Sequence, residues 1–432
     1  MLLNCLKRDT IGTIMQEDQT QVLVVGAGPV GLLTALLLAE EGVRVQIIDK
    51  EQRTAVHSYA CVLHPGTLKL LQRLGLATEL LAQGRRLDSV AFYEGDSRKA
   101  EIKMSTLGGE FPYSVVLPQS AFEDALEQRL RQKSGVNVLW NHRLSDLTLE
   151  QGAAIARVDK LAQTGKGYIV PDYDWSVQKQ SQVRADFVVG ADGHHSMVRS
   201  RLGLDYEHFA GPELFAVFEF ETGEDPGNEL RIAMDDATTN VLWPLPGNRA
   251  RWTFQLVKAR DEGEFPTKDR EAVRIVQQEV DRTTRQQLER LARNRAPWFK
   301  TAVKDVYWWT RIRFDHELVK QFGKGRGWLA GDSAHQTGPV GVQSMNAGLS
   351  EAADLSARLA KIIRDRASTR ILEEYNASQR SHWEKLLGLK GGCKANGTTD
   401  AWMARHSAKI LPCIPATGDD LVNLTTPLGF GF

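Results

Sequence analysis

The sequence predicts a mixed α/β fold, in which a Rossmann-like domain is interleaved with a second domain built on a β-sheet. Residues 21–48 hold two short apolar runs on either side of an apolar helical segment, with glycines between them, the pattern of a strand–helix–strand unit. Residues 214–257 contain several strand-like runs at short spacing, which indicates a separate sheet. Apolar side chains recur at three- and four-residue steps over 345–362, as in an amphipathic helix.

Composition excludes several classes of protein. The chain has 432 residues, 42% hydrophobic and 25% charged, which is ordinary for a globular protein of two domains. Lys plus Arg equals Asp plus Glu at 54 each, so no overall basic field would attract nucleic acid. Four scattered cysteines, at positions 5, 61, 393 and 413, fit neither a zinc site nor a disulfide scaffold. We expect no bound metal.

The chain shows no signal peptide and no apolar run of membrane length. We therefore expect a cytoplasmic protein, with residues 1–19 as a polar leader and Met15 as an alternative start. The sequence leaves open whether the protein is a monomer or a homodimer.

Further elements follow from local patterns. We expect helices near 65–83 and 119–134, a buried strand at 136–140 and a hairpin over 144–158 that carries a surface insertion at 160–183. A turn at 246–248 should join two strands, and Trp308–Phe314 should return to the same sheet. Two polar helical stretches are expected between 267 and 294, and the tail from 395 should be a short helix with an irregular end.

The first glycine segment, Gly26-Ala27-Gly28-Pro29-Val30-Gly31, lies between the first strand and the helix. Glycines at this spacing allow a tight turn and a close approach of backbone N–H groups to a pyrophosphate at the helix N-terminus. A plain glycine turn is the alternative interpretation, but the flanking strand and helix favour dinucleotide binding.

Asp49 closes the second strand at roughly the ~20-residue distance expected of an acid that holds a ribose. A carboxylate there would repel a 2′-phosphate, which disfavours NADP in this pocket and leaves FAD or NAD. Asp49 could instead cap a turn.

The second segment is an apolar strand, Asp186–Gly190, followed by Ala191-Asp192-Gly193 and then by Arg199 on an expected helix. Asp192 and Arg199 could contact a ligand or merely pair with each other.

The third segment places Gly331 and Asp332 at the end of a strand, followed by a loop with Pro339 and Gly341. A helix that starts near Val342 would direct free N–H groups and its positive end toward an anionic group, which suits a reduced flavin. Asp332 could accept hydrogen bonds from hydroxyls of the cofactor, or cap the loop. His335, in the same segment, is more simply explained as a packed histidine than as a catalyst.

Taken together, the three segments resemble the flavoprotein monooxygenase family typified by para-hydroxybenzoate hydroxylase, which has an FAD fingerprint, a DG motif and a GD motif in this order. The resemblance covers most of residues 20–365. It implies one tightly and non-covalently bound FAD, a transient NAD(P)H co-substrate and a sheet domain over the flavin ring. The domain boundaries that it implies are 20–85, 115–205 and 325–365 for the FAD-binding domain, 86–114 and 206–324 for the substrate domain, and 366–432 for C-terminal helices and tail.

Roles for individual residues follow from this resemblance. The glycine turn at Gly26, Gly28, Pro29 and Gly31 would hold the pyrophosphate, Asp49 with the adjacent Lys50 the adenosine end, and Gly331 with Asp332 the middle of FAD. The resemblance further implies flavin contacts at Gln119, FAD or NAD(P)H contacts at Asp192, Gly193 and Arg199, and a PxGxQxMN loop beside the ring at Pro339, Gly341, Val342, Gln343, Met345 and Asn346.

The chain also departs from the family pattern. Tyr59 stands where the family often has arginine, and Val342 and Ser344 replace usual glycines, which reduces the freedom of the loop beside the flavin. The thioredoxin-like C-terminal domain of the phenol hydroxylase relatives is not expected here.

The resemblance implies a reaction in which NAD(P)H reduces FAD, O2 adds to the reduced ring, and the flavin hydroperoxide hydroxylates an electron-rich aromatic molecule. The cofactor carries this chemistry, so we assign no catalytic residue. Candidate substrate walls are Phe218, Trp243 and Pro244, with Phe220 and Phe254, although aromatic side chains on strands are more often core. The alternatives are an FAD-dependent reductase or halogenase on the same scaffold, or a flavin-binding accessory protein without turnover.

Overall fold

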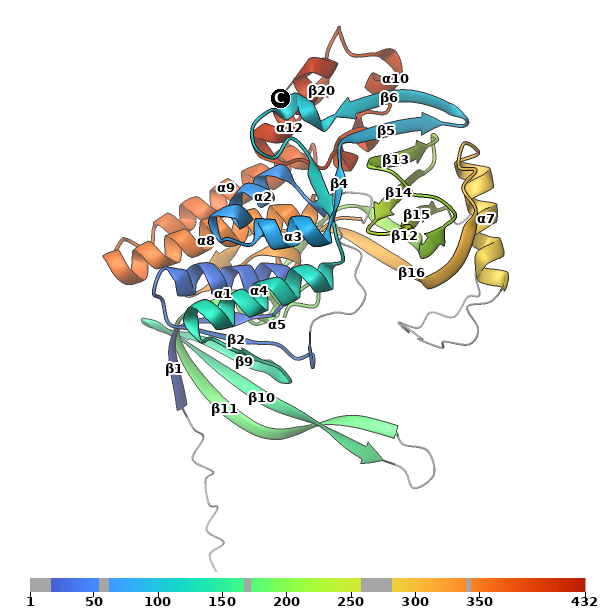
Figure 1. Cartoon of the computed structure of the whole chain (residues 1–432). Coiled ribbons are helices and arrows are strands. Elements are labelled where there is room, and N and C mark those ends of the chain that lie inside the picture. The colour runs from blue at the N-terminus through green and yellow to red at the C-terminus, as the bar shows by residue number, and fades with distance from the viewer. Residues whose placement is uncertain (1–16, 54–61, 167–171, 258–281, 339–342, 432) are drawn as a thin grey trace, which may run out of the picture.

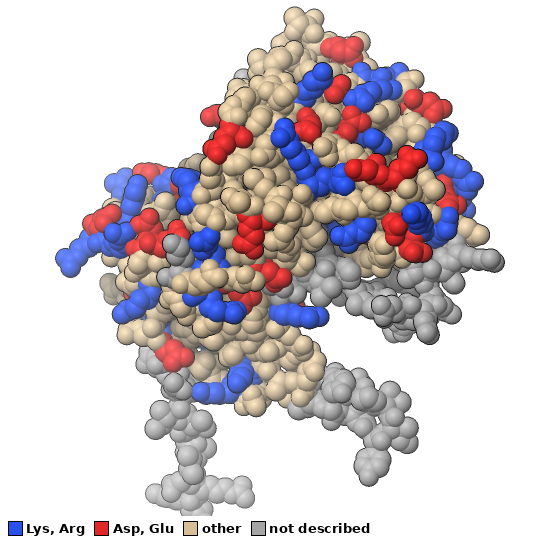
Figure 2. All heavy atoms as spheres, in the orientation of Figure 1, with Lys and Arg blue, Asp and Glu red and all other residues tan. Residues whose placement is uncertain are grey.

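The computed structural model describes residues 17–53, 62–166, 172–257, 282–338 and 343–431. Two eight-stranded sheets organise these residues, and helices cover both (Figure 1). Lys and Arg are interspersed with Asp and Glu over the face seen in Figure 2, in keeping with the balanced charge of the sequence. No helix among the described residues is long and apolar enough to cross a membrane.

The first sheet has a central parallel part. β1 (Glu17–Val25) lies between β2 (Val45–Ile48) and β11 (Asp172–Gly190), and β11 also pairs with β18 (Gly327–Leu329), all in parallel. β17 (Gly323–Lys324) and β8 (Val138–Leu139) lie at the two ends of this order. Residues 22–25 of β1 are at most 5% exposed, as expected of a parallel strand covered on both faces.

Helices cover the parallel strands. α1 (Pro29–Glu40) contacts both α4 (Gln119–Ser134) and α8 (Ser344–Asp365), and α5 (Met197–Leu202) follows β11. α1 is apolar at nearly every position because it is buried between these neighbours. The predicted helices at 119–134 and 345–362 and the predicted strand–helix–strand unit are confirmed.

β9 (His142–Glu150) and β10 (Ala153–Lys166) form the predicted hairpin, but the prediction of a surface insertion at 160–183 is wrong. β10 and β11 continue as a long antiparallel ribbon, paired as far as Lys166 and Asp172, that projects from the molecule (Figure 1). The described side chains at its outer part, such as those of Trp175 and Val177, are exposed, so no alternation of buried and exposed residues revealed the strands.

The predicted leader also needs correction. β1 begins at Glu17, and residues 17–20 pair with 182–185 of β11, so residues 17–19 belong to the first sheet and not to the predicted leader. Residues 1–16 lie outside the described part of the chain.

The second sheet has the strand order β19-β16-β12-β15-β14-β13-β5-β6. The long strands β12 (Tyr206–Thr222) and β16 (Val303–Val319) are antiparallel neighbours, which confirms that residues 308–314 return to this sheet. β14 (Thr239–Leu245) and β15 (Arg249–Leu256) are joined by the predicted turn, where Gly247 has φ +73°. The remaining strands are β5 (Ser89–Glu94), β6 (Ser97–Lys103), β13 (Glu229–Met234) and β19 (His335–Gln336).

α7 (Arg282–Arg295) covers one face of the second sheet. Leu288 and Leu291 from this helix pack with Phe218, Trp252 and Phe254 in one buried cluster. α7 confirms the second of the two predicted helical stretches, and the first lies mostly outside the described residues.

A smaller three-stranded sheet is made of strands that alternate along the chain with strands of the two large sheets. It consists of β3 (Val62–Leu63), β4 (Arg85–Leu87) and β7 (Ser114–Val116). The helical region predicted at 65–83 is present as two helices, α2 (Pro65–Arg73) and α3 (Ala77–Gln83), because Gly75 between them takes φ +69°.

The C-terminal part is more ordered than predicted. α9 (Ile371–Leu386) packs on α8, and beyond it lie α10 (Ala401–Arg405), α11 (Ser407–Ile410) and α12 (Gly418–Thr425), with β20 (Lys394–Ala395) paired to β21 (Phe430–Gly431). Within the described residues there are also four 3-10 turns, at Met104–Leu107, Gly331–Ser333, Leu411–Cys413 and Thr426–Leu428.

These last helices form a cap over the β5 end of the second sheet (Figure 1). Met403, Ile410 and Ile414 pack with Phe92 and Trp243 in a buried cluster. The prediction of one short helix and an irregular end is therefore wrong, because the apolar side chains of the cap are spread over several short helices with no single period.

Candidate functional site

The three predicted motif segments meet at one edge of the first sheet. Val25, Ile48, Gly190 and Leu329 end four neighbouring parallel strands, and they lie side by side in the strand register. The loops that follow β1, β11 and β18 are the three glycine segments, and Asp49 follows β2. The carboxyl edge of a parallel sheet is where such folds bind nucleotides.

Two glycines of the first segment are needed by the fold itself. Gly26 has φ +103°, and a Cβ there would overlap the carbonyl oxygen of Ala191. A Cβ on Gly31 would overlap the carbonyl oxygen of Gly26. The first turn therefore packs directly against the second motif segment, Ala191-Asp192-Gly193, which is called the DG segment below. Only glycine fits at positions 26 and 31.

Gly28 has a different role. A Cβ on Gly28 would have no heavy atom of the described structure within 4 Å, so packing does not require glycine there. Gly28 is the N-cap of α1 and Pro29 occupies the first turn, yet no side chain caps the helix. Open space and uncapped N–H groups at the positive end of a helix are what a pyrophosphate requires, so the chain fits FAD at this point.

Asp49 braces the first glycine segment. Its Oδ2 accepts a hydrogen bond of 2.6 Å from the Ala27 N–H, and its Oδ1 accepts one of 2.8 Å from the Glu51 N–H. The turn-capping alternative is thus present in the structure, and the ribose contact stays a prediction. Lys50, beside it, is exposed.

Asp192 and Arg199 of the DG segment bind different partners, and not each other. Asp192 Oδ2 accepts a hydrogen bond from the Met197 N–H at 2.7 Å, and Oδ1 accepts one from Ser196 Oγ at 2.5 Å, so its carboxylate caps α5. Burial raises the pKa of Asp192, and these hydrogen bonds oppose the rise. Gly193 has φ +73° and borders open space.

Arg199 links the DG segment to the third motif segment around Gly331 and Asp332, which is called the GD segment below. Its Nη1 donates to Tyr206 Oη at 2.7 Å and to the Ser333 carbonyl at 3.0 Å, and its guanidinium lies 3.8 Å from the centre of the Tyr206 ring. Tyr206 Oη in turn donates to the Asp332 carbonyl at 2.8 Å. Burial raises the pKa of Tyr206, so the phenol remains protonated. No sequence pattern singles out this tyrosine.

The buried carboxylate of Glu351 holds the GD segment in place. Gly331 has φ +68° and its N–H donates to Glu351 Oε2 at 2.8 Å, while Trp383 Nε1 donates to Glu351 Oε1 at 2.6 Å. His335 Nε2 lies 3.1 Å from the same carboxylate and the ring is fully buried, which supports its interpretation as a packed histidine. The side chain of Asp332 remains exposed, and its Oδ1 accepts a hydrogen bond from Ser344 Oγ at 3.1 Å.

The loop beside the expected flavin ring is described only in part. Pro339, Gly341 and Val342 lie outside the described residues, as does Tyr59. α8 starts at Ser344, two residues later than predicted, and no side chain caps it. Ser344, one of the departures from the family pattern, is the residue that bonds Asp332.

Hydrogen bonds within the chain hold two of the residues that follow this loop. Asn346 is 2% exposed, and its amide bonds the N–H of His64, Thr67 Oγ1 and the carbonyl of Val62, each at 2.9 Å. Gln343 is also buried, and its Nε2 lies 3.3 to 3.4 Å from three carbonyl oxygens of residues 411–416 in the C-terminal cap. Met345 is half-buried, and Gln119 at the start of α4 donates to Glu123 Oε1 at 2.6 Å.

The predicted substrate walls fall on two faces of the second sheet. Phe218, with Phe220 and Phe254, lies in the cluster under α7, and alternation places Pro244 on this side as well. Trp243 lies on the opposite face, packed against the C-terminal cap. Only Trp243 therefore lies on the face that the cap covers.

The face of the second sheet that the C-terminal cap covers also carries a group of polar residues, which sequence analysis did not single out. Gln255 Nε2 donates to Glu213 Oε1 at 2.7 Å, and His316 Nε2 lies 2.9 Å from Glu213 Oε2. The three residues come from the neighbouring strands β15, β12 and β16. Their sequence signal is weak, because a polar residue on a strand usually faces solvent.

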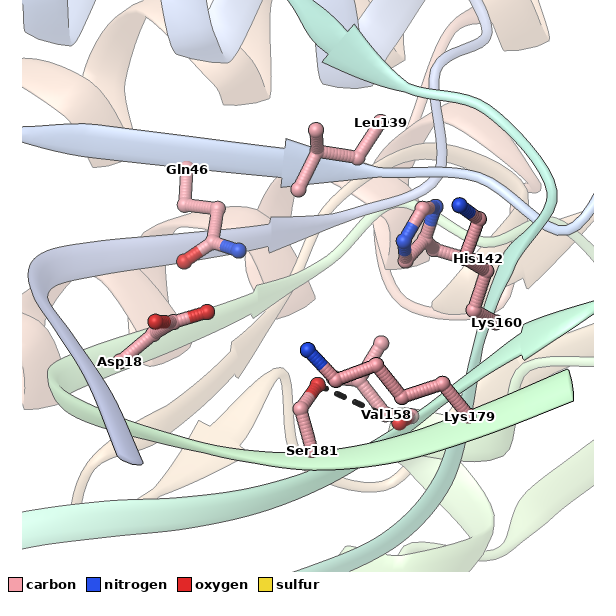
Figure 3. A pocket seen from close by; sticks show the side chains of 8 residues that line it. All are labelled: Asp18, Gln46, Leu139, His142, Val158, Lys160, Lys179 and Ser181. Atoms are coloured by element: carbon pink, nitrogen blue, oxygen red, sulfur yellow. Dashed lines mark hydrogen bonds between the residues drawn. The ribbon is translucent and has the colours of Figure 1, made fainter. Parts of the chain in front are cut away.

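A pocket lies elsewhere, between the parallel strands and the ribbon (Figure 3). Eight residues line it: Asp18, Gln46, Leu139, His142, Val158, Lys160, Lys179 and Ser181. None of the predicted site residues is among them. No group of three or more potential metal ligands was found among the described residues.

Comparison with known proteins identifies the family. The model of the FAD binding domain family matches residues 19–389. The chain belongs to the FAD-dependent aromatic hydroxylase family. Its cofactor is accordingly FAD, and the enzyme is a monooxygenase.

Two of the relatives are monooxygenases by name. The 6-methylpretetramide 4-monooxygenase of Streptomyces rimosus is 30% identical over 420 residues, which cover 96% of this chain and 67% of that protein. The para-nitrophenol 4-monooxygenase of a Pseudomonas strain is 26% identical over 368 residues, 84% of this chain and 83% of that protein.

Solved structures share the fold. The p-nitrophenol 4-monooxygenase PnpA of Pseudomonas putida has a TM-score of 0.69 at 23% identity, over 85% of this chain and 86% of that one. Aklavinone-11 hydroxylase in complex with FAD and aklavinone has a TM-score of 0.68 at 22% identity, over 92% of this chain and 71% of that one. The predicted mixed α/β architecture of this family is confirmed.

Proposed function

We propose that this enzyme uses NAD(P)H and O2 to hydroxylate an aromatic small molecule. The observation that carries the proposal is the meeting of three glycine loops at the ends of β1, β11 and β18, on a chain whose second sheet presents a polar cluster and aromatic side chains on one face. The names of the relatives, which refer to a nitrophenol and to a polycyclic pretetramide, support an aromatic substrate.

The chain would hold FAD from several sides. The N–H groups around Gly28 and the start of α1 would bind the pyrophosphate. Asp49 would accept a hydrogen bond from a hydroxyl group of the adenosine ribose. Asp332, whose carboxylate is exposed, would accept hydroxyl donors from the middle of the cofactor. When bound, FAD would supply the transfer of electrons from NAD(P)H and the activation of O2.

The protein's own contribution is to orient the reactants and to exclude water. α8 is 22 residues long and its first turn has no side-chain cap, so its positive end would favour negative charge near residues 344–346. Asn346 and Gln343 fix that helix start to the β3–α2 segment and to the C-terminal cap. The cap would thereby help to close the substrate region of the second sheet.

Oxidation of NADH and of NADPH by the FAD-loaded protein tests the proposal, with and without a panel of phenols and polycyclic aromatic compounds. We expect at least one compound to accelerate oxidation and to yield a hydroxylated product. Reduction of FAD without any hydroxylated product would instead favour the reductase alternative. Absence of reduction under every condition would favour the accessory protein.

A further inference from the structure

Glu213, Gln255 and His316 form a cluster on the face of the second sheet that is turned away from α7. Gln255 cannot rotate freely, because its Oε1 accepts a hydrogen bond of 2.8 Å from the Thr239 N–H while its Nε2 donates to Glu213. His316 lies against the other carboxylate oxygen at 2.9 Å. One oxygen of the Glu213 carboxylate is thus held by a hydrogen bond from β15, and His316 of β16 lies beside the other oxygen.

The cluster lies where the second sheet meets the segment that leads into residues 339–342. A Cβ built on Gly338 would be 3.0 Å from Glu213 Oε2 and 3.3 Å from the ring of Phe215. Burial raises the pKa of the Cys413 thiol in the C-terminal cap, and the Glu213 carboxylate adds to this rise. The thiol is therefore neutral.

The surroundings of the carboxylate are aromatic. Phe215 and Phe314 lie on the same face, with ring centres 6.0 Å apart at a near-perpendicular angle, and Phe314 is the register partner of Glu213. Phe215 is fully buried, whereas the side chain of Glu213 is 34% exposed. A pocket of apolar walls with a few placed polar groups is the usual design of a small-molecule site.

The carboxylate still has acceptor capacity. An ionised carboxylate offers about four acceptor positions, and the hydrogen bond from Gln255 occupies one of them. A hydroxyl group carried by an aromatic ring matches both the free acceptor positions and the aromatic walls.

We propose that Glu213 determines substrate specificity by accepting a hydrogen bond from a hydroxyl group on the aromatic substrate, and that Gln255 and His316 are positioning residues that hold its carboxylate. This inference rests on the proposed function, since it names the group that the same site recognises. It selects phenols over their ethers, because an ether has no proton to donate and would leave an acceptor position of the carboxylate unfilled.

The test compares two phenols with their methyl ethers: 4-nitrophenol with 4-nitroanisole, and 2-naphthol with 2-methoxynaphthalene. Binding to the FAD-loaded protein is measured by the change in flavin absorption. Hydrogen bonds to charged groups predict that the wild-type protein binds at least one of the phenols about tenfold to hundredfold more tightly than its ether. The variant Glu213→Gln should lose most of this preference.

Glu221→Gln is the matched control, because it removes one carboxylate from the same strand, where Glu221 bonds the exposed Tyr307. It should keep the full preference for the phenol. His316→Gln should raise KM for the phenol about tenfold while kcat stays nearly unchanged. A merely structural role of His316 would not produce this result. This second variant also serves if Glu213→Gln does not fold.

A folded Glu213→Gln variant that keeps the wild-type preference would overturn the assignment. So would a wild-type protein that binds neither phenol more tightly than its ether. If the wild-type protein also shows no accelerated NAD(P)H oxidation with any aromatic compound, the proposed function itself fails. Accelerated oxidation without the phenol preference refutes only the role of Glu213.

Discussion

The backbone N–H of Ala27 donates a hydrogen bond of 2.6 Å to Asp49 Oδ2, and this bond ties the first glycine loop to the end of β2. The second oxygen of the same carboxylate accepts the Glu51 N–H. The residue that the family resemblance assigns to the ribose thus also shapes the loop that would hold the pyrophosphate, and the two roles can be separated by mutation.

Replacement of Asp49 by alanine should weaken FAD binding at least tenfold and lower the free energy of unfolding by about 1–2 kcal/mol, because two N–H groups lose their acceptor. Asp49→Asn retains one acceptor oxygen and should lie between wild type and alanine in both measurements. FAD affinity is followed by flavin fluorescence, and stability by thermal unfolding of the cofactor-free protein. Unchanged FAD affinity in the alanine variant would limit Asp49 to bracing the loop.

The glycines at 26 and 28 should respond differently to alanine. Gly28→Ala adds a methyl group to open space at φ −72°, so the cofactor-free protein should keep its stability while FAD binding falls about tenfold or more. Gly26→Ala places a Cβ against Ala191 at φ +103°, so it should disrupt folding itself. Normal FAD binding by Gly28→Ala would remove this glycine from the pyrophosphate site.

Asn346→Ala tests the anchoring of the α8 start. The change removes three buried hydrogen bonds, to His64, Thr67 and Val62, and should cost about 3 kcal/mol of stability. Chemical denaturation of the cofactor-free protein measures this loss. Asn346→Asp keeps the acceptor but not the donor and should recover part of it. A loss below about 0.5 kcal/mol for the alanine variant would show that this anchor is not needed.

His382 should make the stability of the protein depend on pH. Burial lowers its pKa below the ordinary value of 6.5, although the carboxylate of Glu351 opposes this effect. The unfolded chain therefore takes up a proton first as the pH falls below about 6.5, and stability is lost until the folded state is protonated too. Melting temperatures between pH 7 and pH 5 should fall less steeply for His382→Gln than for the wild-type protein. Equal slopes would exclude His382 as the source.

The motif loops could be predicted from sequence because their requirements are local. Gly26 and Gly331 take positive φ angles at the ends of strands, and such turns leave a glycine at a fixed place in the chain. The amphipathic period of α8 and the apolar run of β1 are equally local. The interpretation of His335 as a packed residue also followed from general tendencies of histidine.

Other parts of the site depend on contacts between distant residues. Glu351 lies on α8, 20 residues after Gly331 in the chain. Nothing in the sequence around Glu351 indicates a buried carboxylate that binds the GD turn. Glu213, Gln255 and His316 come from three strands, and their meeting depends on strand register, which the sequence does not reveal. The same limit led to Phe218 as a wall, since alternation alone cannot tell which face a helix covers.

The proposed function requires that the enzyme transfer one atom of O2 to an aromatic substrate. The most direct test supplies labelled O2 to the FAD-loaded protein with NAD(P)H and the aromatic compound that accelerates its oxidation most, and analyses the product by mass spectrometry. We predict a hydroxylated product that carries one labelled oxygen atom. A product without the label, or hydrogen peroxide as the only reduced form of oxygen, would show that the enzyme is not an aromatic hydroxylase.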